Sequence, residues 1–392
     1  MKFSCLSTEL AKGISIVEKA ISNRTPMAVL ENISMKTSGS QLVLRGNNLE
    51  VGIEYKVPLI KEETAGDVLI KAQTISHVVS KMSGEHEVDI SVDDKQKILI
   101  HSNKVDFDLL GRESSEYPEF PSFTDAVQFT IPIKTLKSLI QHTIFSVSTD
   151  EGKPFLNGVL MAVDGSQMTM VATDGFRLSL DKVPFSEVAE PFEVIVPSKA
   201  MSELNRIFPL LGDEESVSIQ LGEKQISFSC QNFLLVSRII QGKFPDYRHV
   251  LPDTSEYTEY RLSKRTLLSA CERADVIAHH SNQTVRLSFQ DQEVLVTAKS
   301  AKMGEFQESI PVVSAANAGS PLRISYNIRL LTDAIKHIES DDLSICFNNA
   351  FGPCVFRPVS SDAYVYVVMP IRVTEFDDEA SSEPVATASA GA

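Results

Sequence analysis

The sequence lacks the features that mark secreted, membrane-spanning and metal-binding proteins. No apolar run among its 392 residues approaches the roughly 20 that a membrane-spanning helix needs, and the N-terminus has no signal-peptide core. The five cysteines are odd in number, scattered and never in C-x-x-C spacing: Cys5, Cys230, Cys271, Cys346 and Cys354. This pattern favours reduced thiols over a disulfide framework or a zinc site. We therefore expect a cytoplasmic protein with no membrane partner, metal or other cofactor.

Motifs that carry catalysis are also missing. The sequence contains no G-x-x-x-x-G-K-[ST] phosphate loop, no G-x-G-x-x-G opening a helix and no H-E-x-x-H. His279 and His280 are adjacent, so they do not share a helix face as metal ligands would. The acidic pairs 93–94 and 341–342 lie at expected turns and are predicted to face solvent. We predict a protein that is not an enzyme, although a Ser–His–acid grouping formed in space stays open.

Composition gives a first, negative indication about partners. Hydrophobic residues make up 43% and charged residues 23% of the chain, which is ordinary for a soluble globular protein. The length suits two to four domains rather than one core. A formal net charge of -15 argues, taken alone, against nucleic acid as a partner.

Six short amphipathic segments recur along the chain, with starts roughly 61 to 67 residues apart. They begin near Thr8, Thr74, Thr135, Ser198, Arg265 and Ile328. In the fourth, Met201, Leu204, Ile207 and Phe208 share one helical face, and Ser198 is expected to cap the first turn. Between the segments the pattern alternates with the period of half-buried strands. Each repeat therefore reads as strand, helix and three strands.

Pairing the repeats predicts an α+β protein of three similar domains, at 1–125, 126–255 and 256–373. Proline-rich stretches at 116–121 and 252–255 are the expected linkers, because proline resists both helix and central strand. Residues 374–392 are rich in Glu, Asp, Ser, Ala and Pro, and we expect them to form an acidic, disordered tail.

The charges are distributed unevenly over these repeats. The six helical windows sum to about +7, which leaves about -22 for the rest of the chain. If the helices line one surface, that surface is positive and offers sequence-independent contacts to phosphates. The candidate contacts are Arg24, Lys12, Lys71, Lys81, Lys137, Lys199 and Arg206. Each lysine alone can equally be read as a solvated residue of an amphipathic helix.

Two stretches are unusual for framework strands. Residues 172–178 (Ala-Thr-Asp-Gly-Phe-Arg-Leu) place a tight turn, an aromatic ring and an arginine between strands. Residues 242–248 (Gly-Lys-Phe-Pro-Asp-Tyr-Arg) bring Pro, Tyr and Arg together at the end of the second domain. On their own they are better explained as a hairpin and a proline-stiffened linker than as a functional site.

With these motifs the chain resembles the bacterial β sliding clamps, the processivity subunits of DNA polymerase III. The resemblance covers residues 1–372 and depends on the order of several motifs. They are the Met-Lys-Phe opening, Ser-Asn-Arg-Thr at 22–25, Leu-Asn-Gly at 156–158, A-T-D-G-x-R-L at 172–178, V-I-V-P-x-K at 194–199, Phe-Pro-Asp-Tyr at 244–247 and Val-Met-Pro-Ile-Arg at 368–372.

The resemblance implies a head-to-tail homodimer that closes into a ring, with helices lining a hole around double-stranded DNA. Arg24 and Lys199 match DNA-facing positions of the family, and Lys153 lies in a loop that varies among its members. The strand at 104–110 is a candidate sheet edge, with Phe107 and Leu109 on one face. In the family this edge meets domain three of the other subunit, where Val276 and Ile277 match the apolar contacts.

The resemblance also implies a pocket for short peptides of the replicative polymerase, the clamp loader and repair polymerases. Its walls, carried over by motif, are Leu156, Thr173, Gly175, Phe176, Arg177, Leu178, Pro245, Arg248, Val250, Asn327, Val367, Met369, Pro370 and Ile371. Phe176 departs from the family, in which histidine is common, and the chain continues beyond the usual end near Arg372. A repeat-built enzyme or a peptide-binding scaffold that never encloses DNA is the competing interpretation.

Overall fold

A computed structural model describes residues 1–22, 27–82, 84–120, 127–185, 191–212, 215–251 and 257–372. Two compact units divide the chain. The first comprises residues 1–172 and 182–244, and the second comprises residues 173–181 together with the chain from Pro245 onward. Arg24, the linker at 252–255 and the tail at 374–392 lie outside the described residues.

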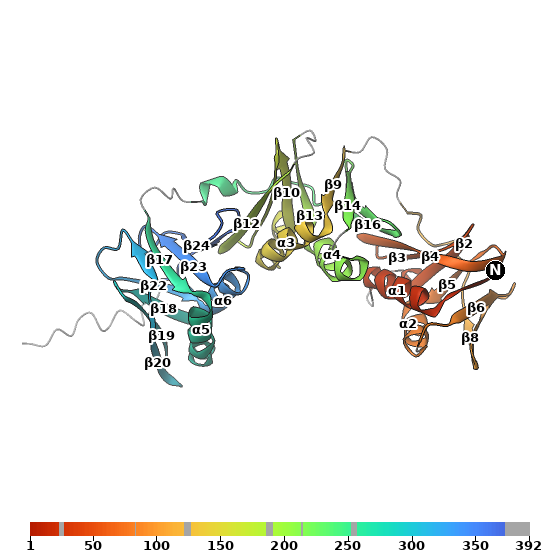
Figure 1. Ribbon diagram of the computed structural model, residues 1–392, viewed down its shortest axis with the longest axis horizontal. Helices are drawn as coiled ribbons and strands as arrows, with labels where there is room; N and C mark the ends of the chain where they lie inside the picture. The colour runs from red at the N-terminus through yellow and green to blue at the C-terminus, as the bar shows by residue number, and fades with distance from the viewer. Residues whose placement is uncertain are drawn as a thin grey trace, which may run out of the picture. The chain divides into compact units, whose positions relative to one another are not determined.

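Six successive repeats of strand, helix and three strands confirm the predicted pattern (Figure 1). The first repeat is β1 (Lys2–Leu6), α1 (Ser7–Val17), β2 (Asn32–Ser38), β3 (Gln41–Asn47) and β4 (Val51–Thr64). The second is β5 (Asp67–Lys71), α2 (Ala72–Ser80), β6 (Glu87–Val92), β7 (Lys97–Ser102) and β8 (Val105–Leu110). The third is β9 (Val127–Pro132), α3 (Ile133–Thr143), β10 (Gly158–Asp164), β11 (Gln167–Thr173) and β12 (Arg177–Pro184).

The remaining repeats follow the same order. The fourth is β13 (Phe192–Pro197), α4 (Ser198–Leu211), β14 (Ser216–Leu221), β15 (Gln225–Cys230) and β16 (Phe233–Arg238). The fifth is β17 (Thr258–Ser263), α5 (Lys264–Ala278), β18 (Thr284–Phe289), β19 (Glu293–Ser300) and β20 (Gly304–Pro311). A short strand β21 (Ser314–Ala316) precedes the sixth, which is β22 (Leu322–Asn327), α6 (Ile328–Lys336), β23 (Asp342–Phe347), β24 (Cys354–Pro358) and β25 (Val365–Val368).

The helices bury the faces that the apolar spacing predicts. In α4, Met201, Leu204, Ile207 and Phe208 are fully buried. The helices pack in pairs, α1 with α2, α3 with α4 and α5 with α6. The predicted cap at Ser198 is wrong, because Pro197 occupies the N-cap position and no side chain caps that helix end. No helix in the described part of the chain is long and apolar enough to cross a membrane.

In the first unit, β4 connects the sheets. Its residues 52–58 pair with β3, residues 59–64 with β1 and residues 51–55 with β16, all antiparallel. This pairing makes one sheet path in the order β8-β7-β6-β1-β4-β16-β15-β14-β9, while β13-β10-β11 form a second face. One apolar core runs through both predicted domains of this unit.

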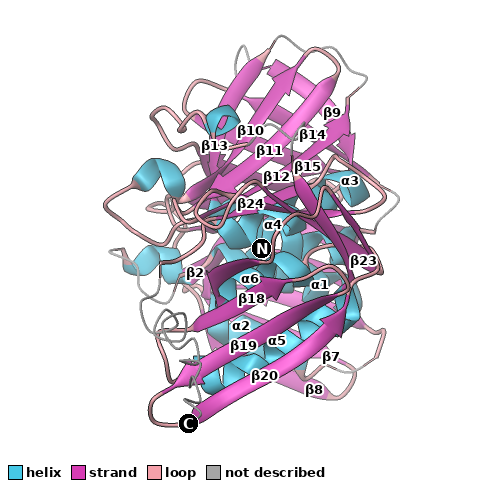
Figure 2. Cartoon of the chain, turned by 90° about the vertical axis from the view of Figure 1, so that its left-hand side faces the viewer, coloured by secondary structure: helices cyan, strands magenta, loops and turns pink. Residues whose placement is uncertain are grey.

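The second unit contains two antiparallel sheets. Their orders are β20-β19-β18-β22 and β12-β25-β24-β23-β17-β21. Figure 2 shows β18, β19 and β20 side by side, and α5 packs against these strands. Aromatic rings fill the core here, with Phe289 4.6 Å from Phe347 and Tyr326 6.0 Å from Phe356 between centroids. Such ring pairs add stability beyond the area that they bury.

Gly46 lets β3 pass close to the end of α1. A Cβ atom on Gly46 would lie 2.5 Å from the backbone oxygen of Val17, and a backbone atom cannot swing aside as a side chain can. A helix and a strand therefore pack here at a distance that only glycine permits.

The hairpin of β7 and β8 ends the sheet path of the first unit, as predicted for an edge at 104–110. His101 lies between two carboxylates of neighbouring strands, because its register partners are Asp89 on β6 and Asp106 on β8. Its Nδ1 is 2.6 Å from Asp106. The hydrogen bond and charge of Asp106 raise the pKa of His101, against a small opposing effect of burial, and Asp89 adds to the increase.

Replacing Gly46 with alanine should destabilise the fold by about 1–3 kcal/mol, because the added methyl group forces helix and strand apart. Thermal unfolding measures the effect. Gly319→Ala is the matched control, since a Cβ there would meet nothing within 4 Å. Equal melting temperatures for the two variants would contradict the close packing at Gly46.

Replacing Asp106 with asparagine should lower the pKa of His101, as measured by NMR titration of the imidazole ring. The raised folded-state pKa means that the pair stabilises the hairpin fully below the unfolded value of about 6.5. That stabilisation is lost as pH rises through the folded-state pKa. Asp108→Asn is the control, because Asp108 pairs with Lys97 at 2.6 Å instead. An unchanged His101 pKa in Asp106→Asn would show that the hydrogen bond does not form.

Candidate peptide-binding and nucleic-acid surfaces

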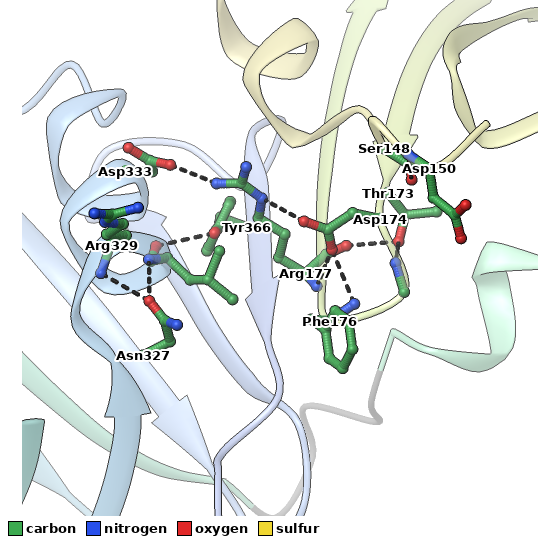
Figure 3. A network of polar contacts seen from close by, with 12 residues as sticks. Ser148, Asp150, Thr173, Asp174, Phe176, Arg177, Asn327, Arg329, Asp333 and Tyr366 are labelled. Atoms are coloured by element: carbon green, nitrogen blue, oxygen red, sulfur yellow. Dashed lines mark hydrogen bonds and ion pairs between the residues drawn. The ribbon is translucent and has the colours of Figure 1, made fainter. Parts of the chain in front are cut away.

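The turn between β11 and β12 is held by its own side chains (Figure 3). The Asp174 carboxylate accepts hydrogen bonds from the backbone N–H groups of Phe176 at 2.9 Å and Arg177 at 3.0 Å. The Thr173 hydroxyl accepts from the N–H of Gly175 at 3.1 Å and donates to the Arg177 carbonyl at 2.6 Å. Gly175 has φ of 94°, a conformation that glycine adopts without strain. The Thr-Asp-Gly sequence thus specifies a tight turn that leaves the Phe176 side chain 68% exposed.

Arg177 joins this turn to α6. Its Nε donates to Asp174 at 3.0 Å, and its Nη1 donates to Asp333 at 2.5 Å. The Arg177 side chain is only 12% exposed. Burial opposes its charge, but Tyr366, Asp333 and Asp174 together raise the pKa of Arg177 above its ordinary value. We call Asp174, Arg177 and Asp333 the Arg177 bridge.

Asn327, which the resemblance assigns to the peptide pocket, caps α6. Its Oδ1 accepts from the N–H groups of Arg329 at 3.0 Å and Leu330 at 3.4 Å. The hydroxyl of Tyr366 donates to the Leu330 carbonyl at 3.0 Å and so ties this first helical turn to β25. The oxygen of Asn327 is therefore already used by the fold.

An apolar surface lies where β12 begins and β25 ends. Leu178 and Val367 are register partners in this ladder and are buried, so they support the surface from below. Met369 donates its N–H to the Phe176 carbonyl at 2.9 Å, and both side chains are exposed. Phe176 and Met369 are thus the apolar side chains that this ladder presents to solvent.

The other residues that the resemblance assigns to the pocket are not part of this ladder. Pro370 and Ile371 are half-buried, and Ile371 donates its N–H to the Ser325 carbonyl at 2.8 Å. Pro245, Arg248 and Val250 are exposed along one segment of the second unit. Leu156 belongs to the first unit and is buried in a short 3₁₀ turn.

Several residues of this surface were missed from the sequence. Asp174, Asp333 and Tyr366 hold it together, but Asp333 is 156 residues from Arg177 and no motif connects the two. Phe351 is largely exposed, and the guanidinium of Arg372 lies 5.3 Å from the centroid of its ring. The sequence did offer a signal for Phe351, because it is an aromatic residue placed in a turn.

The candidate DNA contacts on and near the helices of the first unit differ in availability. Three of them form ion pairs, Lys71 with Glu31 at 3.8 Å, Lys199 with Glu50 at 3.4 Å and Arg206 with Glu203 at 3.0 Å. Lys81 and Lys153 are exposed, and Lys137 and Lys12 are half-buried. The positive charge of these helices is therefore partly offset by neighbouring carboxylates.

On the helices of the second unit, basic residues are largely engaged within the unit. Arg273 donates two hydrogen bonds to Glu308, at 2.8 and 2.6 Å. Lys336 of α6 lies 3.8 Å from Glu272 of α5. Lys264 donates to backbone carbonyls at the end of α6. These three cations are therefore already paired or hydrogen-bonded within the unit.

The side chains predicted to form the dimer contact are only partly exposed. Phe107 and Leu109 are half-buried and pack against the core, so β8 presents its backbone edge more than these side chains. Val276 is 64% exposed on α5, and Ile277 is half-buried beside it. The two groups of residues lie in different units.

The structure gives no support to metal chemistry at the acidic or histidine pairs. The rings of His279 and His280 meet edge to face at the end of α5, with centroids 5.6 Å apart. The Asp93 carboxylate accepts from backbone N–H groups in a turn, at 2.8 and 2.9 Å. In the described ranges, no three His, Cys, Asp or Glu side chains are placed to hold a metal ion.

Family models and curated relatives that match this chain all belong to one family. Models of the DNA polymerase III beta subunit match its N-terminal domain at residues 1–121, its central domain at 130–246 and its C-terminal domain at 248–372. The beta sliding clamp of Bacillus subtilis is 30% identical over 383 residues, which cover 95% of this chain and all of that protein. The clamp of Halalkalibacterium halodurans is 30% identical and covers 92% of this chain and 97% of its own.

Solved structures agree. The Bacillus subtilis sliding clamp superposes with a TM-score of 0.87 at 30% identity, covering 95% of this chain and 99% of its own. The Pseudomonas aeruginosa clamp bound to griselimycin gives a TM-score of 0.89 at 26% identity, covering 95% of this chain and all of its own. The chain therefore belongs to the beta sliding clamp family, the beta subunit of DNA polymerase III.

Proposed function

We propose that two copies of this chain close head to tail into a ring around double-stranded DNA. Each copy would contribute three domains, near 1–125, 126–255 and 256–373, and the ring would slide without recognising sequence. As a member of its family the chain is a non-catalytic processivity subunit of DNA polymerase III. The ring would work in the cytoplasm, where it tethers the polymerase by enclosure rather than by chemistry.

The observation that carries this proposal is the equivalence of the six helices. Each occurs at the same place in its repeat, and the sequence gives them a positive sum within a chain of net charge -15. Exposed cations such as Lys81 and Lys153 would contact phosphates directly. Lys71 and Lys199 would exchange a weak surface ion pair for a phosphate, since such pairs contribute little in water. Arg206 instead pairs with the largely buried Glu203, whose charge it would leave uncompensated by turning away.

Partners would bind through the surface built around Phe176 and Met369. These exposed apolar side chains lie at the end of a sheet ladder whose backbone is fixed by hydrogen bonds. A flexible methionine suits side chains of differing shape, such as the Leu or Phe of a short linear peptide. We propose that the replicative polymerase, the clamp loader and repair polymerases present such peptides here.

Closure would join the two ends of the chain's row of domains. The proposed contacts are Phe107 and Leu109 at the β8 edge and Val276 and Ile277 on α5 of the other copy. An edge strand exposes unpaired backbone groups, so a dedicated partner protects it from unwanted association.

Retention on circular DNA tests the ring. Protein placed on a nicked circle by its loader should stay bound through gel filtration at high salt, because enclosure does not depend on screened charges. Cutting the circle should release it. Linear duplex is the control, from which the protein should be lost at once. Equal loss from circles and linear duplex would refute enclosure.

Replacing Val276 with aspartate should yield folded monomers, because a charge in the centre of an apolar contact is costly to bury. Sedimentation velocity measures the change. Val276 is a safer site than Phe107, which packs against the core. Val313→Asp is the matched control, since Val313 is 57% exposed in the same unit and lies outside the proposed contact. A persistent dimer in Val276→Asp would place the interface elsewhere.

A further inference from the structure

The guanidinium of Arg177 contacts two carboxylates of the protein, one through Nε and one through Nη1. Nε contacts Asp174 and Nη1 contacts Asp333, and little of the side chain reaches solvent. A planar guanidinium can bridge two carboxylates at fixed angles, which a lysine ammonium cannot do. Arg177 is therefore placed to hold parts of the protein together rather than to wait for a ligand.

The bridge connects a turn to a helix. Asp174 and Gly175 belong to no strand, so the position of the turn depends on side-chain contacts. One oxygen of Asp174 receives the N–H groups of Phe176 and Arg177, and the other receives Arg177 Nε. Asp333 lies on α6, whose first turn is fixed by the Asn327 cap and by Tyr366. The line from Asp174 through Arg177 to Asp333 thus joins the turn to a well-anchored helix (Figure 3).

The opposite side of the turn is fixed by the sheet. The Phe176 carbonyl accepts the N–H of Met369, directly after the register pair of Arg177 with Val368. Phe176 therefore has its carbonyl held by β25 and its N–H held by Asp174. Its ring has no polar atom, so these backbone contacts, rather than hydrogen bonds of the side chain, fix the point from which the ring projects.

We propose that Asp333, acting through Arg177, is a positioning residue that sets the orientation of Phe176 for an apolar side chain of a partner peptide. Asp333 need not touch the peptide. This inference rests on the proposed peptide-binding function of the same surface. It changes the expected role of Arg177 from a wall of the peptide pocket to a support of the turn.

Removing either end of the bridge should loosen the turn. Without the charge of Asp333, the largely buried Arg177 keeps Asp174 and Tyr366 as partners but loses one of its two carboxylates, so turning toward water becomes more favourable. With lysine at position 177, a single point charge cannot reach both carboxylates. Both changes act on the same connection, so their effects should not add.

The test compares Asp333→Asn, Arg177→Lys and the double variant in the full-length protein. Fluorescence polarisation with a short fluorescein-labelled peptide ending in Leu-Phe measures affinity, and hydrogen exchange measures the amides of Phe176 and Arg177. Each single variant should bind about tenfold more weakly and exchange these amides faster, with the double variant no weaker than the singles. Glu272→Gln is the matched control, because it removes a carboxylate of α5 that pairs with Lys336 of α6 and not with Arg177.

The outcomes separate this inference from the proposed function. If Arg177 instead contacts the peptide, Arg177→Lys will weaken binding while Asp333→Asn leaves it unchanged, and the inference is overturned. Unchanged amide exchange in Asp333→Asn also overturns it, whatever the affinity. Failure of the unaltered protein to bind the probe refutes the peptide surface itself. If Asp333→Asn does not fold, Arg177→Lys decides through the same exchange of the Phe176 amide.

Discussion

A short helix with one apolar face needs a sheet to cover that face, and the architecture of this chain depends on that requirement. The helices α2 and α6 have nine residues each, too few to be stable alone in water. The strands of each repeat provide the cover, and a second repeat doubles the buried area. Pairing of helices follows, and their polar faces remain together on the uncovered side. Lysines on those faces, such as Lys199 of α4, are therefore left outside the buried core.

The helices and repeats could be predicted from the sequence because burial imposes a period that is visible in the residues. The starts at Thr74 and Thr135 were expected two residues late, since apolar spacing marks the buried face and not the helix end. The cap expected at Ser198 failed because the preceding proline takes that position. The cap at Asn327 was visible in principle, as an asparagine directly before an amphipathic run.

The candidate site was harder to predict because its support comes from distant segments. The turn at residues 173–177 could be identified from its motif, but the partner of Arg177 lies on α6. The partners of the lysines could not be predicted from the sequence for the same reason. Lys71 and Lys199 were counted as available, whereas the carboxylates that offset them, Glu31 and Glu50, come from a 3₁₀ helix and a loop outside the helical windows. The charge counted over the helical windows therefore overstates the positive potential at the surface of these helices, because carboxylates from other segments lie beside the lysines.

The Arg177 bridge is better understood through orientation than through stability. A partly buried cluster of charges is often no more stabilising than apolar residues of similar size, because each charge loses its hydration. Such a cluster does, however, allow few geometries. The Phe176 ring has no polar atom through which a hydrogen bond could orient it. The polar contacts of the turn and of Asp333 fix the backbone that carries this ring, and so limit the directions that the exposed side chain can take.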